Sequence, residues 1–201
     1  MSIVREAIRA IRITLVLWLL TAIIYPLFIV LIAQVPLLQE KANGSIIYNL
    51  KDEPIGSALI GQQFRNERYF HSRPSTIRYS QGKQARPTGI SGASNLAPSN
   101  PELLKRIVEQ ANQLKDEDIE PLADLIYTSG SGLDPHISIQ AALAQLDRVA
   151  RARGVRKEEI LPLLDKYTDK RFLGIFGDPG VNVLRLNYAL DLQDVNRRQN
   201  Q

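Results

Sequence analysis

The stretch ITLVLWLLTAIIYPLFIVLIAQV, residues 13–35, decides the fold class because it separates a membrane segment from the rest of the chain. As a helix, this stretch would be about 35 Å long, and a bilayer core needs about 30 Å. A cleaved signal peptide is the alternative, but its apolar region has only about 7–15 residues and ends in an A-x-A site. The run is longer and has no such site. It therefore predicts an uncleaved transmembrane helix over 13–35.

The charges on either side of the span predict its orientation. Residues 1–12 contain Arg5, Arg9 and Arg12, whereas Glu40 and Lys41 offset each other after the span. Positive charge is preferentially retained on the cytoplasmic side of a membrane. We therefore expect the N-terminus in the cytoplasm and the main domain outside it, where it does not meet cytoplasmic nucleotide.

A proline lies in the middle of the span, directly after Tyr25. Pro26 has no N–H and leaves the carbonyl of Ala22 without its helical donor, so the helix is expected to bend there. The bend either shapes the helix for packing against partner helices, with Tyr25 and Pro26 at the contact, or is tolerated in a lone anchor. Both interpretations remain open.

The composition of the chain excludes several classes of function. The 201 residues include no cysteine, which rules out disulfides, thiolate metal sites and thiol nucleophiles. The net charge is +4, but basic and acidic residues nearly balance outside the first twelve positions. A chain without a strong basic excess is not expected to bind nucleic acid.

The part after the connector 36–44 has the pattern of one mixed domain. Residues 45–192 combine helical periodicity with short apolar runs, which predicts an α+β fold carried on the single transmembrane helix. Helices are expected after the cap Asn100, from Ser138 to Gly154, and over about 157–168. Strands are expected over 45–50, 125–128 and 181–190, and a polar tail over 193–201. The second helix is expected to bury Ala142, Leu143, Leu146, Val149 and Ala150.

A loop-rich region over 62–100 carries a basic centre. Its Gly, Pro, Ser and Asn content indicates turns. A single acidic residue, Glu67, accompanies the basic side chains, which are Arg65, Arg68, Arg73, Arg78, Lys83 and Arg86. The region is either a solvated or partner-facing loop, or one that binds anions.

The residues that carry chemistry do not form a recognisable catalytic or metal site. Ser131, Asp134 and His136 are the residue types of a serine hydrolase, but SGSG lacks the G-x-S-x-G spacing and all three lie in one loop. His71 and His136 are the only histidines, so no metal site is expected. The Gly-Lys of SQGKQ, residues 80–84, lacks the first glycine and the Ser/Thr of a P-loop. The sequence therefore predicts no catalytic and no metal-ligating residue.

The stretch TSGSGLDPHISIQAA, residues 128–142, is interpreted as a turn from a strand into a helix. Gly130 and Gly132 permit positive φ and can aim backbone N–H groups in one direction. Asp134 stands before a proline, and Ser138 is suited to cap the helix that follows. Such a turn could receive an acidic group or a loop of a partner.

Six motifs follow the span in a fixed order: GSALIGQQF, YFHSRPS, SGASNLAPSNPEL, SGSGLDPHIS, RVARARGV and GDPGVNVLRLNYALD. Together they resemble the C subunit of the bacterial Kdp potassium-transporting ATPase, over about residues 13–192. The family commonly has Gly where Ala93 stands and Pro where Ile139 stands. These departures affect the expected local geometry and leave the resemblance intact.

The resemblance implies a subunit of a complex in the bacterial plasma membrane, with no catalysis and no cofactor of its own. In that complex a channel-like subunit selects K⁺, a P-type subunit hydrolyses ATP, and a small single-span subunit completes the assembly. ATP and K⁺ therefore belong to the complex, and membrane lipid surrounds its anchor.

Two roles are implied for such a subunit. One is assembly, with an outer domain that covers the ion entrance. The other is that of a catalytic chaperone that raises the ATP affinity of the pump, with Gln62 of LIGQ contributing. The predicted topology favours assembly, and Gln62 then only hydrogen-bonds within a strand and turn. A membrane-anchored hydrolase and a solute-binding module are the alternatives from other classes.

Two turn segments, residues 89–100 and 128–138, are the expected docking face toward the channel-like subunit. Small side chains let backbones approach closely, and both segments precede helix starts with exposed N–H groups. The candidate contacts are Ser91, Ser94, Asn95, Ser129, Ser131, Asp134 and His136. The alternative is that these residues only hold the turns of their own domain.

Overall fold

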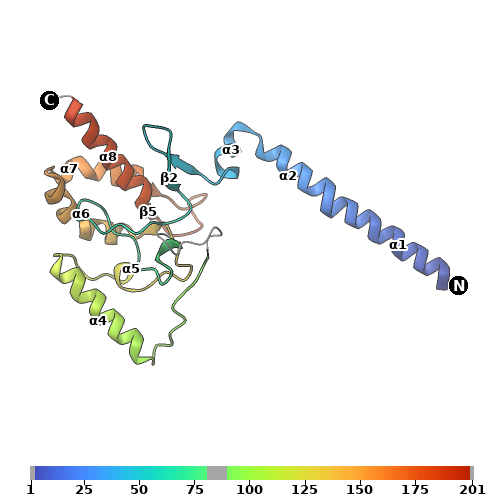
Figure 1. Ribbon diagram of the computed structural model, residues 1–201, viewed down its shortest axis with the longest axis horizontal. Coiled ribbons are helices and arrows are strands. Elements are labelled where there is room, and N and C mark those ends of the chain that lie inside the picture. The colour runs from blue at the N-terminus through green and yellow to red at the C-terminus, as the bar shows by residue number, and fades with distance from the viewer. Residues whose placement is uncertain (1–2, 81–89, 200–201) are drawn as a thin grey trace. The chain divides into compact units, whose positions relative to one another are not determined.

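The structure, a computed structural model, describes residues 3–80 and 90–199. The chain divides into two units, Met1–Ile46 and Ile47–Gln201. The first is a helical anchor and the second a mixed α/β domain, so the predicted fold class is confirmed. Figure 1 shows the elements of both units along the chain.

The first unit contains a continuous helix, Ile3–Ala33, that is long and apolar enough to cross a membrane. It consists of α1 (Ile3–Leu19), a π-helical turn (Leu20–Ile24) and α2 (Tyr25–Ala33). The helix begins ten residues before the predicted span of 13–35 and ends two residues before its end. Charged residues of the N-terminal segment are thus part of the same helix, because nothing in residues 3–12 breaks helical periodicity.

The π-helical turn lies directly before the proline of the span. The N–H of Tyr25 donates to the carbonyl of Leu20, five residues earlier, in place of the usual four. Pro26 follows at the start of α2 and has no N–H to place in the helical ladder. The helix thus remains continuous past the proline by changing its hydrogen-bond spacing.

The connector predicted over 36–44 is largely helical. Helix α3 spans Pro36–Ala42 and begins after Val35, which is extended (φ −60°, ψ 128°). A residue before proline is pushed out of the helical region, and proline is well suited to the first helical turn. The sequence...VPLL... therefore ends one helix and starts the next.

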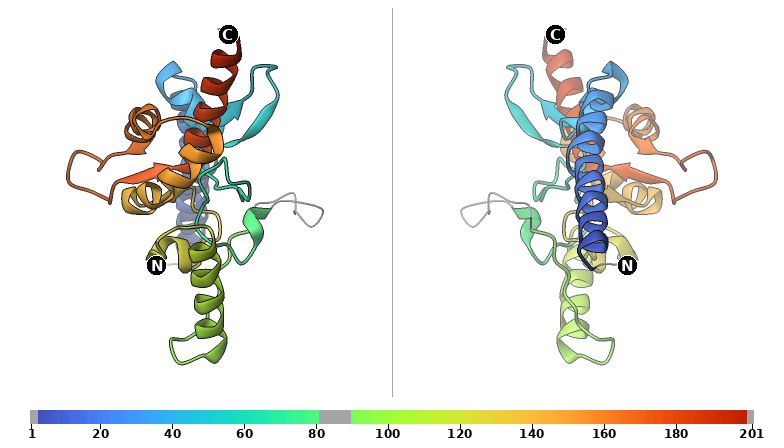
Figure 2. Two further views of the ribbon diagram at one scale, coloured as in Figure 1. Left: turned by 90° about the vertical axis from the view of Figure 1, so that its left-hand side faces the viewer. Right: turned by 90° about the vertical axis from the view of Figure 1, so that its right-hand side faces the viewer.

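The second unit contains two small sheets and the remaining helices (Figures 1 and 2). Strands β1 (Ile46–Tyr48) and β2 (Pro54–Ser57) form one sheet. Strands β3 (His136–Ile137), β5 (Gly180–Asn182) and β4 (Thr168–Asp169) form an antiparallel sheet in that order. The helices are α4 (Pro101–Asp116), α5 (Ala123–Ile126), α6 (Ile139–Arg153), α7 (Lys157–Lys166) and α8 (Val183–Gln199), with a short 3₁₀ turn at Arg78–Ser80.

The capping residues identified in the sequence start and stop the helices as predicted. Asn100 accepts the N–H of Glu102 (2.9 Å) at the start of α4. Ser138 accepts the N–H of Ala141 (3.2 Å) at the start of α6, and Gly154 ends that helix in the left-handed conformation (φ 66°). Helix α7 ends two residues before the predicted 168.

Two predicted strands were wrong. Residues 125–128 belong to the end of α5 and the chain after it. Of residues 181–190, only the first two continue β5, and the rest are the start of α8. The reason is Asn182, whose side-chain oxygen accepts the N–H of Arg185 (3.1 Å) and so acts as a helix cap inside an apolar run that resembles a strand.

Helix α8 also contains most of the residues interpreted as a polar tail. It continues to Gln199, and Asp194 lies 2.7 Å from both Arg68 and Arg153. The segment is polar because it pairs with basic side chains of the domain, so residues 193–199 are part of the fold.

The core lies where α6 and α8 pack with the three-stranded sheet. Residues Ala142, Leu146, Val149 and Ala150 of α6 are buried as predicted, but Leu143 is 45% exposed. Two polar residues of α6, Gln145 and Arg148, are buried instead. Their burial is explained by a stretch of irregular chain that crosses the helix.

This stretch, residues 67–71, is termed the clamped segment because side chains from helices supply its hydrogen bonds. Phe70 donates its N–H to Asn187 Oδ1 (2.8 Å) and accepts from Asn187 Nδ2 (2.9 Å). His71 donates its N–H to Gln145 Oε1 (2.6 Å) and accepts from Gln145 Nε2 (3.2 Å). Each side-chain amide donates one hydrogen bond to the segment and accepts one from it, as a neighbouring strand would. The backbone of the segment can therefore be buried without secondary structure of its own.

Two arginines complete the clamp. Arg148 donates to the carbonyls of Glu67 (2.6 Å) and Tyr69 (3.0 Å). Arg153 donates through Nε to the carbonyl of Arg68 (2.6 Å), and its side chain is 1% exposed. The guanidinium forks thereby satisfy the carbonyls that the amides do not reach.

Candidate docking surfaces

The turn after α5 is held by its own hydroxyl groups. Ser129 is 2% exposed, and its Oγ accepts the N–H groups of Ser131 and Gly132 (both 3.2 Å). The Oγ of Ser131 accepts the N–H of Leu133 (3.1 Å) and lies 3.1 Å from Ser129 Oγ. Gly130 is open to solvent on the side where a Cβ would project. These bonds keep the turn compact, and they point the two hydroxyls inward.

The second predicted segment lies against this turn. Ser131 accepts, at its carbonyl, the N–H of Gly92 (2.8 Å) and the hydroxyl of Ser91 (3.1 Å). Gly132 has φ 68°, and a Cβ there would lie 2.6 Å from the carbonyl oxygen of Gly92 and 2.7 Å from Ile77. Only glycine fits this approach of two backbones. The structure thus brings together the described parts of both segments, while residue 89 lies outside the described residues.

Asp134 and His136 are engaged with neighbouring elements of the domain. Asp134 accepts the N–H of His136 (3.0 Å) and pairs with Arg73 (3.1 Å). His136 Nε2 lies 2.7 Å from Asp169 Oδ2 at the start of the β4–β5 hairpin. The imidazole therefore links strands β3 and β4, and the hydroxyl of Ser131 has other partners.

The seven candidate contacts differ in their exposure. Ser91 and Asn95 are exposed, and Asn95 has a positive φ of 52°. Ser94, Ser131, Asp134 and His136 are half-buried, and Ser129 is buried. The side chains of the 129–136 turn are mainly used inside the domain, so Ser91 and Asn95 offer the most accessible groups of this face.

Gln62 is bound within the β1–β2 region. Its Nε2 donates to the carbonyl of Ile55 (2.7 Å). A Cβ on Gly56 would collide with this amide, so the glycine is needed to let the side chain lie there. The hydrogen bond within strand and turn is the arrangement expected if Gln62 has a structural role.

The basic stretch is partly neutralised within the domain. Arg68 pairs with Asp194 (2.7 Å), and Arg73 pairs with Asp134 (3.1 Å) and Asp124 (3.9 Å). Lys83 and Arg86 lie outside the described residues. Among residues 3–80 and 90–199, no group of three or more potential metal ligands occurs.

The ring of Tyr79 is buried next to Gly61 and the turn 128–138. Burial raises its pKa to about 12, and the negative charge of Asp134 acts in the same direction. The phenol therefore stays neutral and donates to the carbonyl of Arg73 (2.5 Å). A Cβ on Gly61 would meet Asp134 O at 2.6 Å and the ring of Tyr79, so this contact also depends on a glycine.

An apolar hairpin tip, residues 172–176, is the feature that sequence reasoning missed. It lies between β4 and β5, and Figure 2 shows this loop projecting from the rest of its unit. Four large apolar side chains are 62–74% exposed: Phe172, Leu173, Ile175 and Phe176. The run FLGIF is apolar, and apolar runs are ordinarily assigned to the core. Only Gly174, in the middle of the run, and Gly177, directly after it, indicate a turn, and both have a positive φ.

The hairpin tip is held in one shape. Phe172 and Phe176 exchange backbone hydrogen bonds of 2.8 and 3.0 Å. Arg171 and Asp178 pair at its base (3.3 Å). Because the backbone is closed on itself, the four side chains are presented on a preformed turn.

Comparisons with known proteins match nearly the whole chain, including residues of both units. The family described as "K+-transporting ATPase, c chain" matches residues 7–192. A Nostoc sp. protein named "Potassium-transporting ATPase KdpC subunit 2" is 69% identical over 200 residues, with 100% of both chains covered. A KdpC subunit of Anabaena sp. is 70% identical with the same coverage, and one of Bacillus mycoides is 43% identical over 185 residues, 90% of this chain and 92% of its own. The chain therefore belongs to the KdpC family, the accessory C subunits of potassium-transporting ATPases.

Proposed function

We propose that the chain is a non-catalytic assembly subunit that joins the channel-like and ATP-hydrolysing subunits of a potassium-transporting complex. Its domain docks on the channel-like subunit at the outer side and covers the ion entrance, and the small single-span subunit belongs to the same assembly. The observation that carries this proposal is the apolar hairpin tip, whose four large side chains are 62–74% exposed.

An exposed cluster of this kind favours a protein partner. Contiguous apolar patches on soluble domains mark interaction sites, and full burial of one large apolar side chain is worth about 1.5–3 kcal/mol. The side chains of the tip lie on a closed turn, so little ordering entropy is lost on binding. Two phenylalanines in it are the residue type that anchors protein interfaces.

Ser91 and Asn95 form the second contact of this proposal. They are the exposed members of the predicted docking face. The amide of Asn95 can donate to carbonyl or acidic groups of a partner, and the hydroxyl of Ser91, which donates to Ser131, can still accept a hydrogen bond. Asn95→Gly, which removes the amide and tolerates this positive φ, should lower co-purification with the complex and leave the melting temperature nearly unchanged. Asp134→Ala should also lower the melting temperature, since Asp134 pairs with Arg73 inside the domain.

The test of the hairpin is co-purification of the complex from membranes carrying Phe172→Ser with Phe176→Ser. The matched control is Leu104→Ser, because Leu104 is 64% exposed on α4. The hairpin variant should lose most of the channel-like subunit at an unchanged melting temperature, whereas the control should retain it. Equal recovery with both variants would refute docking through the tip.

The proposal includes the topology with the N-terminus in the cytoplasm. Arginines before the span and near-neutral charge after it support this orientation. Protease added to intact spheroplasts should remove the domain and leave the anchor. Full protection of the domain would show that it lies in the cytoplasm and would refute the proposed orientation.

A further inference from the structure

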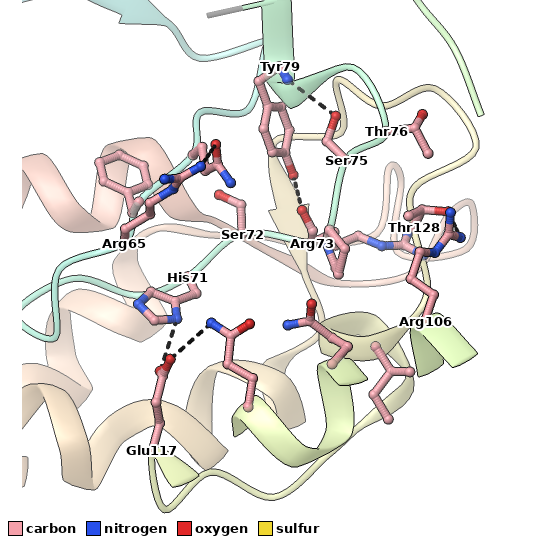
Figure 3. A pocket seen from close by; sticks show the side chains of 16 residues that line it. Arg65, His71, Ser72, Arg73, Ser75, Thr76, Tyr79, Arg106, Glu117 and Thr128 are labelled. Carbon is pink, nitrogen blue, oxygen red and sulfur yellow. Dashed lines mark hydrogen bonds and ion pairs between the residues drawn. The ribbon is translucent and has the colours of Figure 1, made fainter. Parts of the chain in front are cut away.

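A polar cavity of about 490 Å³ lies within the second unit, away from the hairpin tip and not used by the proposed docking. The segment 63–79 forms one wall and the inward face of α4 the other, with Thr128 at one end. Figure 3 shows Arg65 and Arg106 reaching it from opposite sides, with Ser72 and Arg73 between them. Its volume is that of a site for a small molecule.

The charges around this cavity are unbalanced. Of its three arginines, Arg73 is paired with Asp134 (3.1 Å). Arg65 and Arg106 have no carboxylate within 4 Å among residues 3–80 and 90–199. The only carboxylate in the lining, Glu117, lies 3.4 Å from His71 Nδ1 and 3.9 Å from Arg148 Nε, and its Oε2 has no hydrogen-bond partner among the described residues. Two positive charges therefore face the cavity without a counter-ion from the described chain.

The present partners of these two arginines are weak and replaceable. Arg65 donates to the side-chain oxygen of Gln63 and Arg106 to the hydroxyl of Thr128, both at 3.3 Å. Both acceptors are neutral, and both distances exceed those of charge-assisted hydrogen bonds to carboxylate or phosphate. A bound oxyanion would offer each guanidinium a shorter, charged acceptor.

Two buried nitrogen atoms of the lining also lack an acceptor or donor. His71 Nε2 and Arg73 Nε have no hydrogen-bond partner among the described residues, although neither atom is accessible. Native proteins rarely leave such groups unpaired. Because neither atom is exposed to the cavity, a ligand there does not contact them directly, and the proposed contacts are those of Arg65 and Arg106.

The hydroxyl groups of the lining are already used. Ser72 donates to the carbonyl of Gln62 (2.7 Å), Ser75 to that of Gly132 (2.7 Å) and Tyr79 to that of Arg73 (2.5 Å). The charged donors that line the cavity without a carboxylate partner are therefore the guanidinium groups of Arg65 and Arg106, next to neutral groups such as the amide of Gln110. Guanidinium groups recognise planar or tetrahedral oxyanions through paired N–H donors.

We propose that this cavity binds a small free oxyanion, a phosphate or a carboxylate, between Arg65 and Arg106. The ligand links the chain just before the clamped segment, which carries Arg65, to α4, which carries Arg106. Occupancy of the site thus stabilises the folded domain by binding only its native state.

The test uses the full chain purified in detergent, with inorganic phosphate and succinate as separate probes at constant ionic strength. Isothermal titration and the melting temperature report binding. Arg65→Gln with Arg106→Gln should weaken binding at least about tenfold, since each removes a charged donor. The matched control is Lys105→Gln on the same helix, because Lys105 is 76% exposed and does not line the cavity.

Replacement by lysine separates charge from folding. Arg65→Lys with Arg106→Lys keeps both charges and should bind more tightly than the glutamine pair. Binding of either probe that falls in the glutamine pair and not in Lys105→Gln supports the site, and the tighter probe identifies its chemistry. Absence of binding for both probes up to about 10 mM, or equal binding by the glutamine pair and the control, would overturn the proposal. Neither outcome depends on assembly with the complex.

Discussion

Replacing Asn187 tests whether helix side chains hold the clamped segment. Asn187→Leu keeps the branched shape and the number of heavy side-chain atoms but removes both hydrogen bonds to Phe70, of 2.8 and 2.9 Å. Phe70 is 0% exposed, so water does not replace them. A buried polar group left unpaired costs about 1–3 kcal/mol, and two groups are affected, so the free energy of unfolding should fall by roughly 2–6 kcal/mol. For a unit of this size, roughly 4 kcal/mol corresponds to a fall in melting temperature on the order of 10 °C.

The assay is near-ultraviolet circular dichroism of the full chain in detergent, followed at the tyrosine band during heating. Tryptophan fluorescence is unsuitable because the only tryptophan, Trp18, lies in the anchor. Asn187→Asp is a less suitable replacement. It keeps the acceptor for the Phe70 N–H and loses only the donor, but it also introduces a carboxyl group into the core. The matched control is Asn196→Leu, because Asn196 is exposed on the same helix. A melting temperature for Asn187→Leu within about 2 °C of this control would refute the reasoning.

Three further predictions concern single residues. Burial lowers the pKa of His71, the charge of Arg148 acts in the same direction, and Glu117 opposes both. The unfolded chain then binds the proton more readily, so this contribution to stability is complete above about pH 6.5 and is lost as the pH falls from there toward the lower folded pKa. In urea titrations at pH 7 and 5, His71→Gln should therefore lose less stability than wild type, and an equal loss would contradict the lowered pKa. Gln62→Ala should leave the ATP affinity of the assembled pump unchanged in an ATPase assay, because its amide is bound to Ile55; a clear drop would support the catalytic-chaperone role. Gly132→Ala should lower the melting temperature by several degrees, since its Cβ would meet a backbone oxygen at 2.6 Å; an unchanged value would show that the two turns separate easily.

Local signals in the sequence were sufficient for the anchor and for two of the helices. Asn100 before Pro101, and Ser138 with Gly154, act within a few residues of the chain, so their roles follow from the sequence alone. The continuous apolar run over 13–35 is equally local. These parts were predicted correctly because no distant contact alters them.

The parts that failed depend on contacts far along the chain. Asn182 caps α8, but it also donates to the carbonyl of Ala58 (2.8 Å), and an apolar run around it resembled a strand. Gln145 and Arg148 are residue types that usually lie on the solvent-exposed face of a helix. They are buried here because a stretch of irregular chain crosses the helix at these positions. Periodicity cannot reveal a polar residue whose partner is a distant backbone group.

The candidate site was predicted in part for the same reason. The segments 89–100 and 128–138 were singled out for their small residues, and the structure places Gly92 against Ser131, whereas docking on a partner stays a prediction. The apolar hairpin tip was missed because its exposure follows from the antiparallel pairing of β4 with β5. Nothing in the residues of the tip distinguishes an exposed apolar turn from a buried one.

The clamped segment also fixes when the domain can complete its folding during synthesis. Phe70 and Asn187 are 117 residues apart in the chain. At about 5–20 residues per second, the ribosome needs roughly 6–23 s to make the intervening chain. During that time residues 67–71 are already synthesised, but helix α8, which supplies Asn187, is not. The domain therefore depends on its last helix for closure, and truncation within α8 should leave the earlier segments without a stable native state.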